Sequence, residues 1–390
     1  MAQVNTIMSE LLSLFPRYEF EKLEDRYNAN HYTKYFGGWQ QLIVLLFAQA
    51  GRKDSLRDIE TSLSVHHSKW YHIGLQGIKR STLSDAMSKR SYQIYEGLFY
   101  KLLEKCKSVT PKHSFRFKND LYSLDSTTID LCLSLFPWAR FRKRKGAIKL
   151  HYLYDHSGSL PSFMVMTDGK KHDVRVARSE DKLDFALLPD SILSIDKAYI
   201  DYKWLYSLDQ RGVYFVSRVK ENMKHEVTGQ HKPLKHKQII GDDLIKLTGF
   251  YTMKKYPDQL RIVGFVDPET GKYYEFLTNN MDLAATTIAK IYKSRWQIEL
   301  FFKWIKQNLK IKSFLGTSPN AVLTQVWVAM CYYLLLAYIK YQTKYKHTIT
   351  ELSRMIGEGL MNRINLLDIL SLNVKTLNKA REPIPQLALF

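Results

Sequence analysis

The spacing of apolar residues divides the chain into a helical first part and a mixed second part. Up to about residue 110, apolar positions recur with the 3.6-residue period of helices, and Gly37 and Gly38 interrupt the pattern before the apolar run 39–48. From about residue 115, short apolar runs bounded by turn residues are typical of strands. The pattern predicts an all-helical N-terminal domain over residues 1–112, followed by an α/β domain.

Short polar side chains mark two helix starts in the first domain, because they accept hydrogen bonds from the free amide groups there. Ser55 precedes one helix, and Thr82 and Asp85 resemble a capping box at the start of another. The second helix carries Lys89 and Arg90. The pair is compatible with a helix-turn-helix that binds DNA, but the signal is weak, and an ordinary helical pair is the more common alternative.

The second part combines strands and helices. Strands are predicted at 121–125, 148–155, 161–167, 191–196 and 213–219, with turns at Gly146 and at 156–158. Helices are predicted over 174–185 and from Asp201 to near Gly212. Three consecutive strands followed by strand–helix alternation indicate a mixed sheet with flanking helices, which we place at residues 113–219.

Residues 220–283 break this alternation with a strand-rich stretch whose glycines are spaced as turns. The apolar runs 260–266 and 273–278 flank a polar turn and predict a hairpin. We interpret 220–283 as a β-rich insertion. The core then resumes at 284–345, with an apolar helix around 321–340, and a helical segment follows at 346–390.

The stretch 291–306 has no Gly or Pro and predicts a single helix with two unlike sides. Aliphatic and phenylalanine side chains fill one arc, and a polar stripe with helical spacing runs along its edge. The stripe consists of Tyr292, Arg295, Glu299 and Lys306. Taken alone, Arg295 and Glu299 are an ordinary surface ion pair. Trp296 and Trp304, on the other side, indicate instead a mostly buried helix.

The charge balance points to a polyanionic partner. The chain of 390 residues carries 58 Lys and Arg against 38 Asp and Glu, a formal net charge of +20. Such an excess attracts nucleic acid or, as an alternative, an anionic membrane surface. No basic amphipathic helix stands out, so nucleic acid is the expected partner.

The cysteines and the apolar segments indicate in which cellular compartment the protein is expected. Cys106, Cys132 and Cys331 are odd in number and widely spaced, so they form neither a zinc motif nor a disulfide framework. The N-terminus has no basic region before its apolar residues, and we expect no signal peptide. The apolar run 326–339 is shorter than the ~20 residues that span a bilayer, so a buried helix is expected.

Three acidic residues stand in contexts that suit a metal site. Asp125 and Asp196 each end an apolar strand, where ligand sites of α/β sheets lie, and Glu299 belongs to the polar stripe. Hard divalent cations prefer such oxygen ligands, and phosphodiester hydrolysis uses two of them side by side. The alternative for each aspartate is a turn or helix cap. Together the three acids predict a metal-dependent phosphodiester site.

A dense basic run lies between the first two strands. It consists of Arg140, Arg142, Lys143, Arg144 and Lys145. Beside a carboxylate cluster such a run suits backbone phosphates, although a solvated loop is the alternative. Lys149 and His151 share one strand face. We add Lys149 to the expected phosphate contacts and interpret His151 as structural.

These residues resemble the DDE transposases of the insertion-sequence-4 type. The spacing of Tyr292, Arg295, Glu299 and Lys306 matches the Y-R-E-K signature of that family at every position. Residues 124–127 resemble the strand of its first aspartate, 136–139 are also familiar from it, and 194–199 resemble its second-aspartate region. Ala198 departs from the glycine often found there. The resemblance covers about residues 15–345.

The resemblance implies a ribonuclease H-like fold in which Asp125, Asp196 and Glu299 hold two Mg²⁺ or Mn²⁺ ions. It implies cut-and-paste transposition of double-stranded DNA, in which the 3′-hydroxyl freed at a transposon end attacks target DNA. It further implies that Tyr292, Arg295 and Lys306 grip phosphates. Family members can pass through a hairpinned end, with an aromatic residue of the insertion holding a flipped base. Phe250, Tyr251 and Tyr256 are the candidates here.

The family also sets expectations for assembly and location. We expect a homodimer that brings two transposon ends together, in the bacterial cytoplasm and associated with the nucleoid. Two alternatives stay open within this resemblance. One is a transposase-derived DNA-binding protein that no longer cuts, and the other is a different ribonuclease H-like DNA nuclease.

Overall fold

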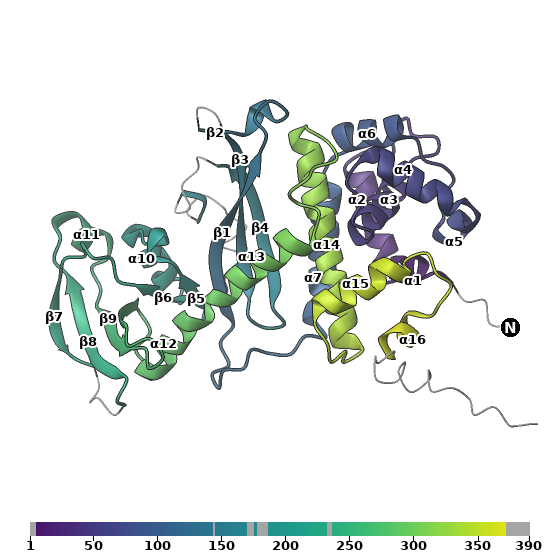
Figure 1. Cartoon of the computed structure of the whole chain (residues 1–390). Coiled ribbons are helices and arrows are strands. Elements are labelled where there is room, and N and C mark those ends of the chain that lie inside the picture. Colours follow the sequence, from purple (N-terminus) through teal and green to yellow (C-terminus); the bar gives the residue numbers. More distant parts are fainter. Residues whose placement is uncertain (1–4, 143–144, 170–174, 178–185, 232–235, 372–390) are drawn as a thin grey trace, which may run out of the picture. The chain divides into compact units, whose positions relative to one another are not determined.

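The computed structural model describes residues 5–142, 145–169, 175–177, 186–231 and 236–371 (Figure 1). It divides the chain into two compact units. The first contains residues 1–110 together with 308–390, and the second contains residues 111–307. Each unit is described by itself.

The described part of the first unit is helical, which confirms the prediction for the N-terminal region. Its elements are α1 (Ile7–Ser13), α2 (Arg17–Arg26), α3 (Gly38–Ala50), α4 (Leu56–Val65), the 3-10 turn η1 (His67–Lys69), α5 (Trp70–Ile73), α6 (Arg80–Lys89), α7 (Gln93–Lys107), α14 (Pro319–Gln342), α15 (Ile349–Gly359) and α16 (Leu366–Ser371). The apolar helix expected around 321–340 is α14, and the helix expected from about 348 is α15.

One predicted helix start is confirmed and the other is wrong. Ser55 caps α4 by accepting from the Asp58 amide at 3.0 Å. Helix α6 instead begins at Arg80, before Thr82, and its first amide donates to Oε1 of Glu60 on α4 at 3.1 Å. A side chain from a neighbouring helix has replaced the local cap.

The connection between α4 and α6 does not form a helix-turn-helix. A helix-turn-helix joins its helices by a turn of about 3–4 residues. Here residues 66–79 intervene and contain η1 and α5. The alternative of an ordinary helical pair fits α4 and α6 better.

Helix α14 is the core of the first unit. By length and composition it is the one helix of the described chain apolar enough to cross a membrane, but 89% of its most apolar window is buried inside the structure. Its buried residues lie all around the helix, as expected of a helix enclosed by protein.

The second unit is built on a mixed sheet. Its strands are β1 (Leu121–Leu131), β2 (Arg140–Arg142), β3 (Lys145–Asp155), β4 (Leu160–Asp168), β5 (Ile192–Ile195), β6 (Tyr214–Arg218), β7 (His225–Gln230), β8 (Ile239–Leu247), β9 (Leu260–Val266) and β10 (Tyr273–Thr278). Its helical elements are η2 (Pro137–Ala139), η3 (Lys197–Tyr199), α10 (Tyr202–Gln210), α11 (Phe250–Lys255), α12 (Ala285–Ser294) and α13 (Trp296–Asn308).

The strand order is β2-β3-β1-β5-β6-β10-β9-β8-β7, and β4 also pairs with β3. The β1–β5 and β5–β6 pairs are parallel, and the other pairs are antiparallel. The strands predicted from the sequence are present, and β9 and β10 form the expected hairpin. Because β10 pairs with β6, the strands of 220–283 extend the same sheet.

Some local predictions need correction. Strand β1 continues through Asp125 to Leu131, so this aspartate lies within a strand and not at its end. Gly146, expected in a turn, lies within β3, where an added Cβ would come 3.0 Å from the Leu131 carbonyl. Most of the helix expected over 174–185 falls outside the described residues.

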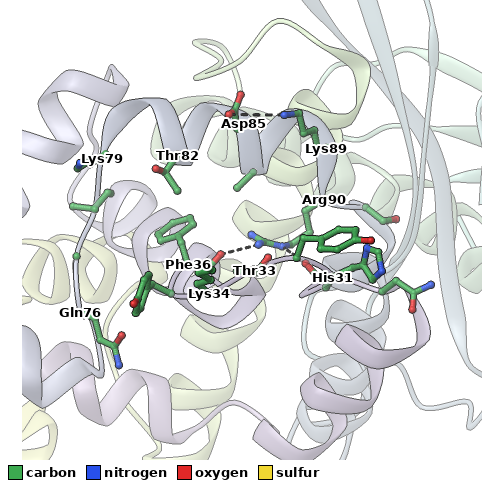
Figure 2. A pocket seen from close by; sticks show the side chains of 18 of the residues that line it. His31, Thr33, Lys34, Phe36, Gln76, Lys79, Thr82, Asp85, Lys89 and Arg90 are labelled. Atoms are coloured by element: carbon green, nitrogen blue, oxygen red, sulfur yellow. Dashed lines mark hydrogen bonds and ion pairs between the residues drawn. The ribbon is translucent and has the colours of Figure 1, made fainter.

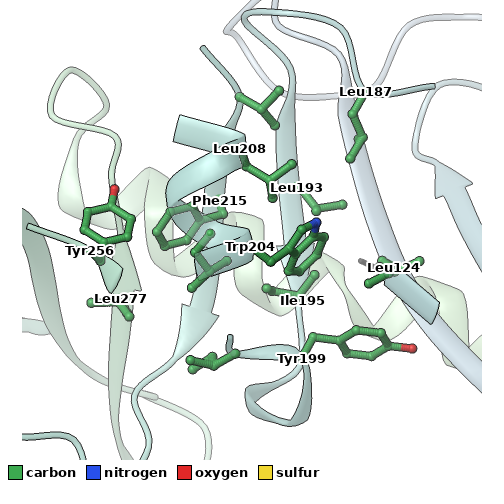
Figure 3. Packing of buried hydrophobic residues seen from close by; sticks show 14 of the residues in the cluster. Leu124, Leu187, Leu193, Ile195, Tyr199, Trp204, Leu208, Phe215, Tyr256 and Leu277 are labelled. Carbon is green, nitrogen blue, oxygen red and sulfur yellow. The ribbon is translucent and has the colours of Figure 1, made fainter. Parts of the chain in front are cut away.

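Different helices cover the two faces of the sheet. On one face Leu124, Ile195 and Phe215 pack beneath Trp204 of α10 (Figure 3). On the other face Leu121, Ile192 and Val216 pack against Ile288 and Ile291 of α12. Since strand side chains alternate between faces, the register decides which face each later residue of β1, β5 and β6 occupies.

Candidate active site

The parallel register brings three charged residues to the same level of neighbouring strands. Leu124 of β1 is paired with Ile195 of β5, and Ile195 with Ser217 of β6. The next residues along these strands are Asp125, Asp196 and Arg218. They therefore stand side by side across the sheet.

All three side chains belong to the face covered by α12. Asp125 lies four residues after Leu121, and Asp196 four after Ile192, so each shares the face of a residue that packs against α12. Arg218 lies two residues after Val216 and has the same orientation. The sheet thus presents two carboxylates and one guanidinium toward α12 and α13.

The helix predicted at 291–306 is present but has a tight turn within it. Helices α12 and α13 meet at Arg295, whose amide donates to the Tyr292 carbonyl, and the Ile298 amide donates to the Arg295 carbonyl. Both bonds span three residues, as in a 3-10 turn. Arg295 therefore projects from the junction of the two helices.

Aromatic packing fixes α13 on the sheet. The rings of Phe301 and Phe302 lie 5.4 Å and 5.7 Å from the ring of Tyr152, which is paired with Asp125 across β1 and β3. Ile298 is fully buried. The helix is less buried than its tryptophans suggested, because Trp296 is 58% exposed.

Arg295 joins the sheet to α13. Its Nη1 donates to Oδ2 of Asp125 at 2.8 Å, and its Nη2 donates to Oε1 of Glu299 at 2.6 Å. The side chains are 12%, 20% and 33% exposed respectively. One cation thus holds together two carboxylates that lie 174 residues apart in the sequence. Arg295 and Glu299 are not the isolated surface pair that the helix alone would suggest.

The aspartates differ in their proton affinity. Burial raises the pKa of Asp125 to about 6, and the nearby charges of Glu299 and Asp196 add to this against the lowering effects of the Ser126 amide and Arg295. Burial raises the pKa of Asp196 too, but the Ala198 amide and Arg218 outweigh it, so the pKa of Asp196 is lowered. Pairs of carboxylates with opposite shifts are typical of functional sites.

Sequence reasoning missed Arg218. Its Nη2 donates to Oδ2 of Asp196 at 3.1 Å, and its guanidinium lies 5.9 Å from the ring of Tyr292. The Arg295 guanidinium lies 5.8 Å from the centre of the same ring, and the Tyr292 and Phe276 ring centres are 4.9 Å apart. The only sequence signal was a cation at the end of an apolar strand, which is also common at solvated strand ends.

A buried polar network connects β1 to α13 close to the carboxylates. His156 Nε2 lies 2.8 Å from Ser123 Oγ, and its Nδ1 lies 3.2 Å from Oε1 of Gln297. Burial lowers the pKa of His156 to about 4, so the ring is neutral at pH 7. Ser123 and Gln297 each lie two residues before a carboxylate, Asp125 and Glu299, and the network therefore helps to fix their separation.

The donor set suits a hard divalent cation. Asp125, Asp196 and Glu299 offer oxygen atoms only, which Mg²⁺ and Mn²⁺ prefer. In the described part of the chain, no three His, Cys, Asp or Glu side chains are close enough to share one metal ion. The reason is local, because the guanidinium of Arg295 stands between Asp125 and Glu299.

Other predicted DNA contacts lie apart from this cluster. Lys306 is seven residues beyond Glu299, about 10 Å along α13 at 1.5 Å per residue. Lys149 is paired with Thr128 and Thr167 and so lies on the opposite face of the sheet from Asp125.

The basic run is only partly described. Arg140 and Lys145 are exposed at the start of β2 and β3, and Arg142 ends β2. Lys143 and Arg144 lie outside the described residues.

Lys89 and Arg90 are adjacent in the sequence but differ in solvent exposure. Lys89 is exposed at the end of α6. Arg90 is 9% exposed, and its three nitrogens donate to the carbonyls of Ala29 and Phe36 and to Oε1 of Gln41. The DNA contact predicted for Arg90 does not fit this position, because its guanidinium is used inside the unit.

The three aromatic candidates of the insertion differ in their exposure to solvent. Phe250 and Tyr251 of α11 are 64% and 74% exposed. Tyr256 is 1% exposed and donates to Oδ2 of Asp209 at 2.6 Å. A buried ring with a satisfied hydroxyl is not accessible to a base, so Tyr256 is excluded from this role.

Comparison with known proteins assigns the chain to a family. Residues 116–335, more than half of the chain, match the family model described as the transposase DDE domain. Residues 3–76 match a domain of unknown function (DUF4372). The DDE match contains all three carboxylates as well as Arg218 and Arg295.

Individual relatives agree with that match. The chain is 31% identical to a probable transposase for insertion sequence element IS5377 of Geobacillus stearothermophilus, over 72% of each chain. It is 33% identical to the candidate transposase y4zB of Sinorhizobium fredii, over 65% of this chain and 69% of that protein.

A solved structure was also found. It is the piggyBac transposase synaptic complex with hairpin DNA, at a TM-score of 0.46 and 10% identity, covering 95% of this chain and 82% of that one. The family model and the sequence relatives are sufficient: the chain belongs to the DDE transposases and is an enzyme of that class.

Proposed function

We propose that this transposase binds the ends of its own insertion sequence and cuts and rejoins double-stranded DNA there by a cut-and-paste route. The observation that supports the proposal is that Asp125 and Asp196 stand side by side on the face of the sheet covered by α12, and that Arg295 links Asp125 to Glu299 of α13. Two arginines, Arg218 and Arg295, lie among them. Three acids with two cations suit a reaction at a phosphodiester.

DDE transposases generally use divalent metal ions. In this chain Asp125, Asp196 and Glu299 would hold two Mg²⁺ or Mn²⁺ ions. When bound, such ions make the attacking hydroxyl a stronger nucleophile and neutralise charge on the leaving oxygen. The carboxylates supply the negative charge that retains the ions, and the sheet and α13 supply the rigidity.

The arginines offer the substrate phosphate its remaining partners. Nε of Arg218 and Nε of Arg295 are buried and have no hydrogen-bond partner among the described residues. Buried donors without partners are costly, and a phosphate oxygen would satisfy them. Tyr292 packs beside both guanidinium groups and orients them. Lys306, Arg140, Arg142 and Lys145 would bind the DNA backbone farther from the scissile bond.

We also propose the ribonuclease H-like character of the core. It is supported by the antiparallel strands β4, β3 and β1, followed by the parallel strands β5 and β6, with Asp125 on β1 and Asp196 directly after β5. Residues 113–219 and 284–307 would then form the core and 220–283 the insertion. The second core segment expected from the sequence, 284–345, also includes α14, which belongs to the first unit. Residues 1–112 would be the helical DNA-binding domain, and 346–390 a C-terminal segment.

A cleavage assay tests the proposal directly. The purified protein, Mg²⁺ or Mn²⁺ and a labelled duplex carrying the end of the element should yield a 3′-hydroxyl at the element's boundary. Asp125→Ala and Glu299→Ala should lower the rate by roughly 1000-fold or more, because bound metal supplies several kcal/mol of transition-state stabilisation. Asp130→Ala is the matched control, since Asp130 is exposed on the same strand.

The same assay separates the alternatives. If both variants cleave as fast as the parent, the catalytic assignment is wrong. Binding of end DNA without cleavage by the parent identifies a transposase-derived protein that no longer cuts. Cleavage without preference for the element's ends indicates a different ribonuclease H-like nuclease. A product of doubled length on a denaturing gel identifies the route through a hairpinned end.

The proposed assembly is a homodimer that holds two ends in one synaptic complex, in the cytoplasm and at the nucleoid. Light scattering of the protein with end DNA measures this state. Two chains with two duplexes are expected, and one chain with one duplex at saturation would contradict it.

A further inference from the structure

The first unit contains a large groove that the DDE chemistry does not use. It lies between helix α6 and the loop of residues 27–36, and residues 76–79 close one end (Figure 2). Its volume is about 1110 Å³. We call it the α6 groove. It exceeds the roughly 300–1,000 Å³ of ordinary small-molecule sites, so a larger ligand is expected.

Exposed aromatic rings line the groove. Tyr32 and Tyr35 are 95% and 75% exposed, and the His31 ring lies 4.0 Å from that of Tyr32. Two large rings exposed to water on one short loop are typical of a surface that a partner covers. The backbone of Tyr32 also has φ +56°, a left-handed conformation that residues other than glycine rarely adopt. Such strain in an exposed aromatic loop is typical of binding sites.

The loop that carries these rings is held from inside. Arg90 donates to the carbonyls of Ala29 and Phe36, and also to Gln41 of α3. Asn30 Oδ1 accepts from the Gly38 amide at 2.9 Å. The rings are therefore presented by a fixed loop, which reduces the entropy lost when a ligand binds.

The charge of the groove suits a polyanion. Lys34 and Lys79 line it and have no ion-pair partner among the described residues, and Lys89 has only a weak exposed contact of 3.9 Å to Asp85. Asp85 is the only acid among the described lining residues. Figure 2 shows Thr82, Asp85 and Lys89 on α6 across from His31, Thr33 and Lys34 on the loop.

Aromatic rings and lysines together favour unpaired nucleotides over a duplex. In a duplex the flat faces of the bases are stacked on one another, and only their edges are accessible in the grooves. Unpaired bases expose these faces, which stack on tyrosine and histidine, while lysines neutralise the backbone. The α6 groove is moreover concave, whereas a helix that reads a duplex projects into its major groove.

We propose that the α6 groove binds a few unpaired nucleotides of DNA, such as a single-stranded tail next to a cleaved end. The inference rests on the proposed action on DNA and adds a second DNA site of different chemistry. Tyr32 and Tyr35 stack on bases, and Lys34, Lys79 and Lys89 contact the phosphates.

Fluorescence anisotropy with the full chain tests this site. The probes are labelled (dT)10, (rU)10, a blunt end duplex and the same duplex with a four-nucleotide tail, at one fixed salt concentration. The double variant Tyr32→Ala/Tyr35→Ala should weaken (dT)10 and tail binding by roughly 10- to 100-fold, because each stacked base contributes measurably. The double variant Tyr32→Phe/Tyr35→Phe keeps the rings and should bind as the parent does.

A matched control excludes a general effect of removing tyrosine. Tyr18→Ala removes a tyrosine that is 67% exposed and outside the groove in the same unit, and it should leave (dT)10 binding unchanged. Blunt-duplex binding and end cleavage should also change little in the Tyr32→Ala/Tyr35→Ala protein.

The outcomes are distinguishable. Unchanged (dT)10 binding by Tyr32→Ala/Tyr35→Ala, in a protein that still cleaves ends, would overturn the groove assignment alone. Tighter binding of (rU)10 than of (dT)10 would overturn the assignment to DNA. If the parent neither binds nor cleaves any of these DNAs, the proposed function itself fails.

Discussion

Arg295 and Arg90 have similar burial but hydrogen-bond partners of opposite character. Both were assigned to DNA from the sequence, and their side chains are almost enclosed. Arg90 donates to two carbonyls and an amide oxygen, all neutral and all within one unit. Arg295 donates to two carboxylates from different elements, and its Nε has no partner among the described residues. The chemistry of the partners, not burial, distinguishes Arg90, which is structural, from Arg295, which is proposed to serve the reaction.

Replacing Arg295 should have the largest effect on the reaction. Arg295→Gln removes the cation between Asp125 and Glu299, and end cleavage should fall by about 100- to 1000-fold, as for the loss of one preorganised donor to a charged transition state. The free energy of unfolding should fall by about 1 kcal/mol or less, since the carboxylates of both ion pairs are partly exposed. Single-turnover cleavage and urea unfolding measure the two effects.

A rate within threefold of the parent would show that Arg295 is structural like Arg90. Arg295→Lys sharpens the test, because lysine keeps the charge but not the fork that reaches both carboxylates. Intermediate activity is expected from it.

Replacing Arg90 should have the opposite effect, a large loss of stability with little change in the cleavage rate. Arg90→Met leaves the Ala29 and Phe36 carbonyls and the Gln41 amide without their donor, and the free energy of unfolding should fall by about 3 kcal/mol. Cleavage by the folded protein should stay near the parent rate. Urea unfolding checks the first effect, and Lys89→Met, at the exposed neighbouring position, should change stability by less than about 0.5 kcal/mol. Equal stability of the two variants would contradict the structural role.

The network beside the carboxylates should make stability depend on pH. The folded pKa of His156 is lowered to about 4, whereas the ordinary value is 6.5. As the pH falls below 6.5, the unfolded chain binds a proton that the folded chain does not, so stability is lost. The contribution of His156 to this loss should reach about 2 kcal/mol by pH 5. Asp125, whose folded pKa is raised to about 6, acts in the opposite direction below that pH.

Urea unfolding between pH 7.5 and 5 measures this dependence, with His156→Gln as the comparison. The groups that face the ring are Ser123, Gln297 and Tyr154, none of which titrates in this range, and the charge of His113 acts in the same direction as burial. If the variant loses stability with pH as steeply as the parent, His156 is not the responsible group.

The smallest expected effects contrast two tyrosines of the sheet extension. Tyr256→Phe removes a buried hydroxyl that donates to Asp209, and the free energy of unfolding should fall by about 1 kcal/mol. Tyr251→Ala alters an exposed ring and should change it by less than about 0.5 kcal/mol. Thermal unfolding of both proteins tests this order. The reverse order would mean that the exposed ring is packed in solution.

Sequence reasoning succeeded where the information is local. The helical first region, the five early strands and the hairpin of β9 and β10 follow from apolar period and turn residues, and the structure has them. Local reasoning failed where a distant side chain replaced a local one. Helix α6 starts at Arg80 because Glu60 of α4 supplies its cap, and no pattern within α6 contains that fact.

The same division applies to the candidate site. The sequence alone determined that Asp125 and Asp196 follow apolar strand residues and which stripe of α12 and α13 is polar, because both follow from side-chain period. Only the tertiary structure placed Asp125, Asp196 and Arg218 at one level, because parallel register joins strands that are far apart in the chain. It also decided that Arg295 bridges two carboxylates while Arg90 binds carbonyls. A guanidinium carries the same charge in any sequence, and its role depends on the partners that the fold brings within hydrogen-bond distance.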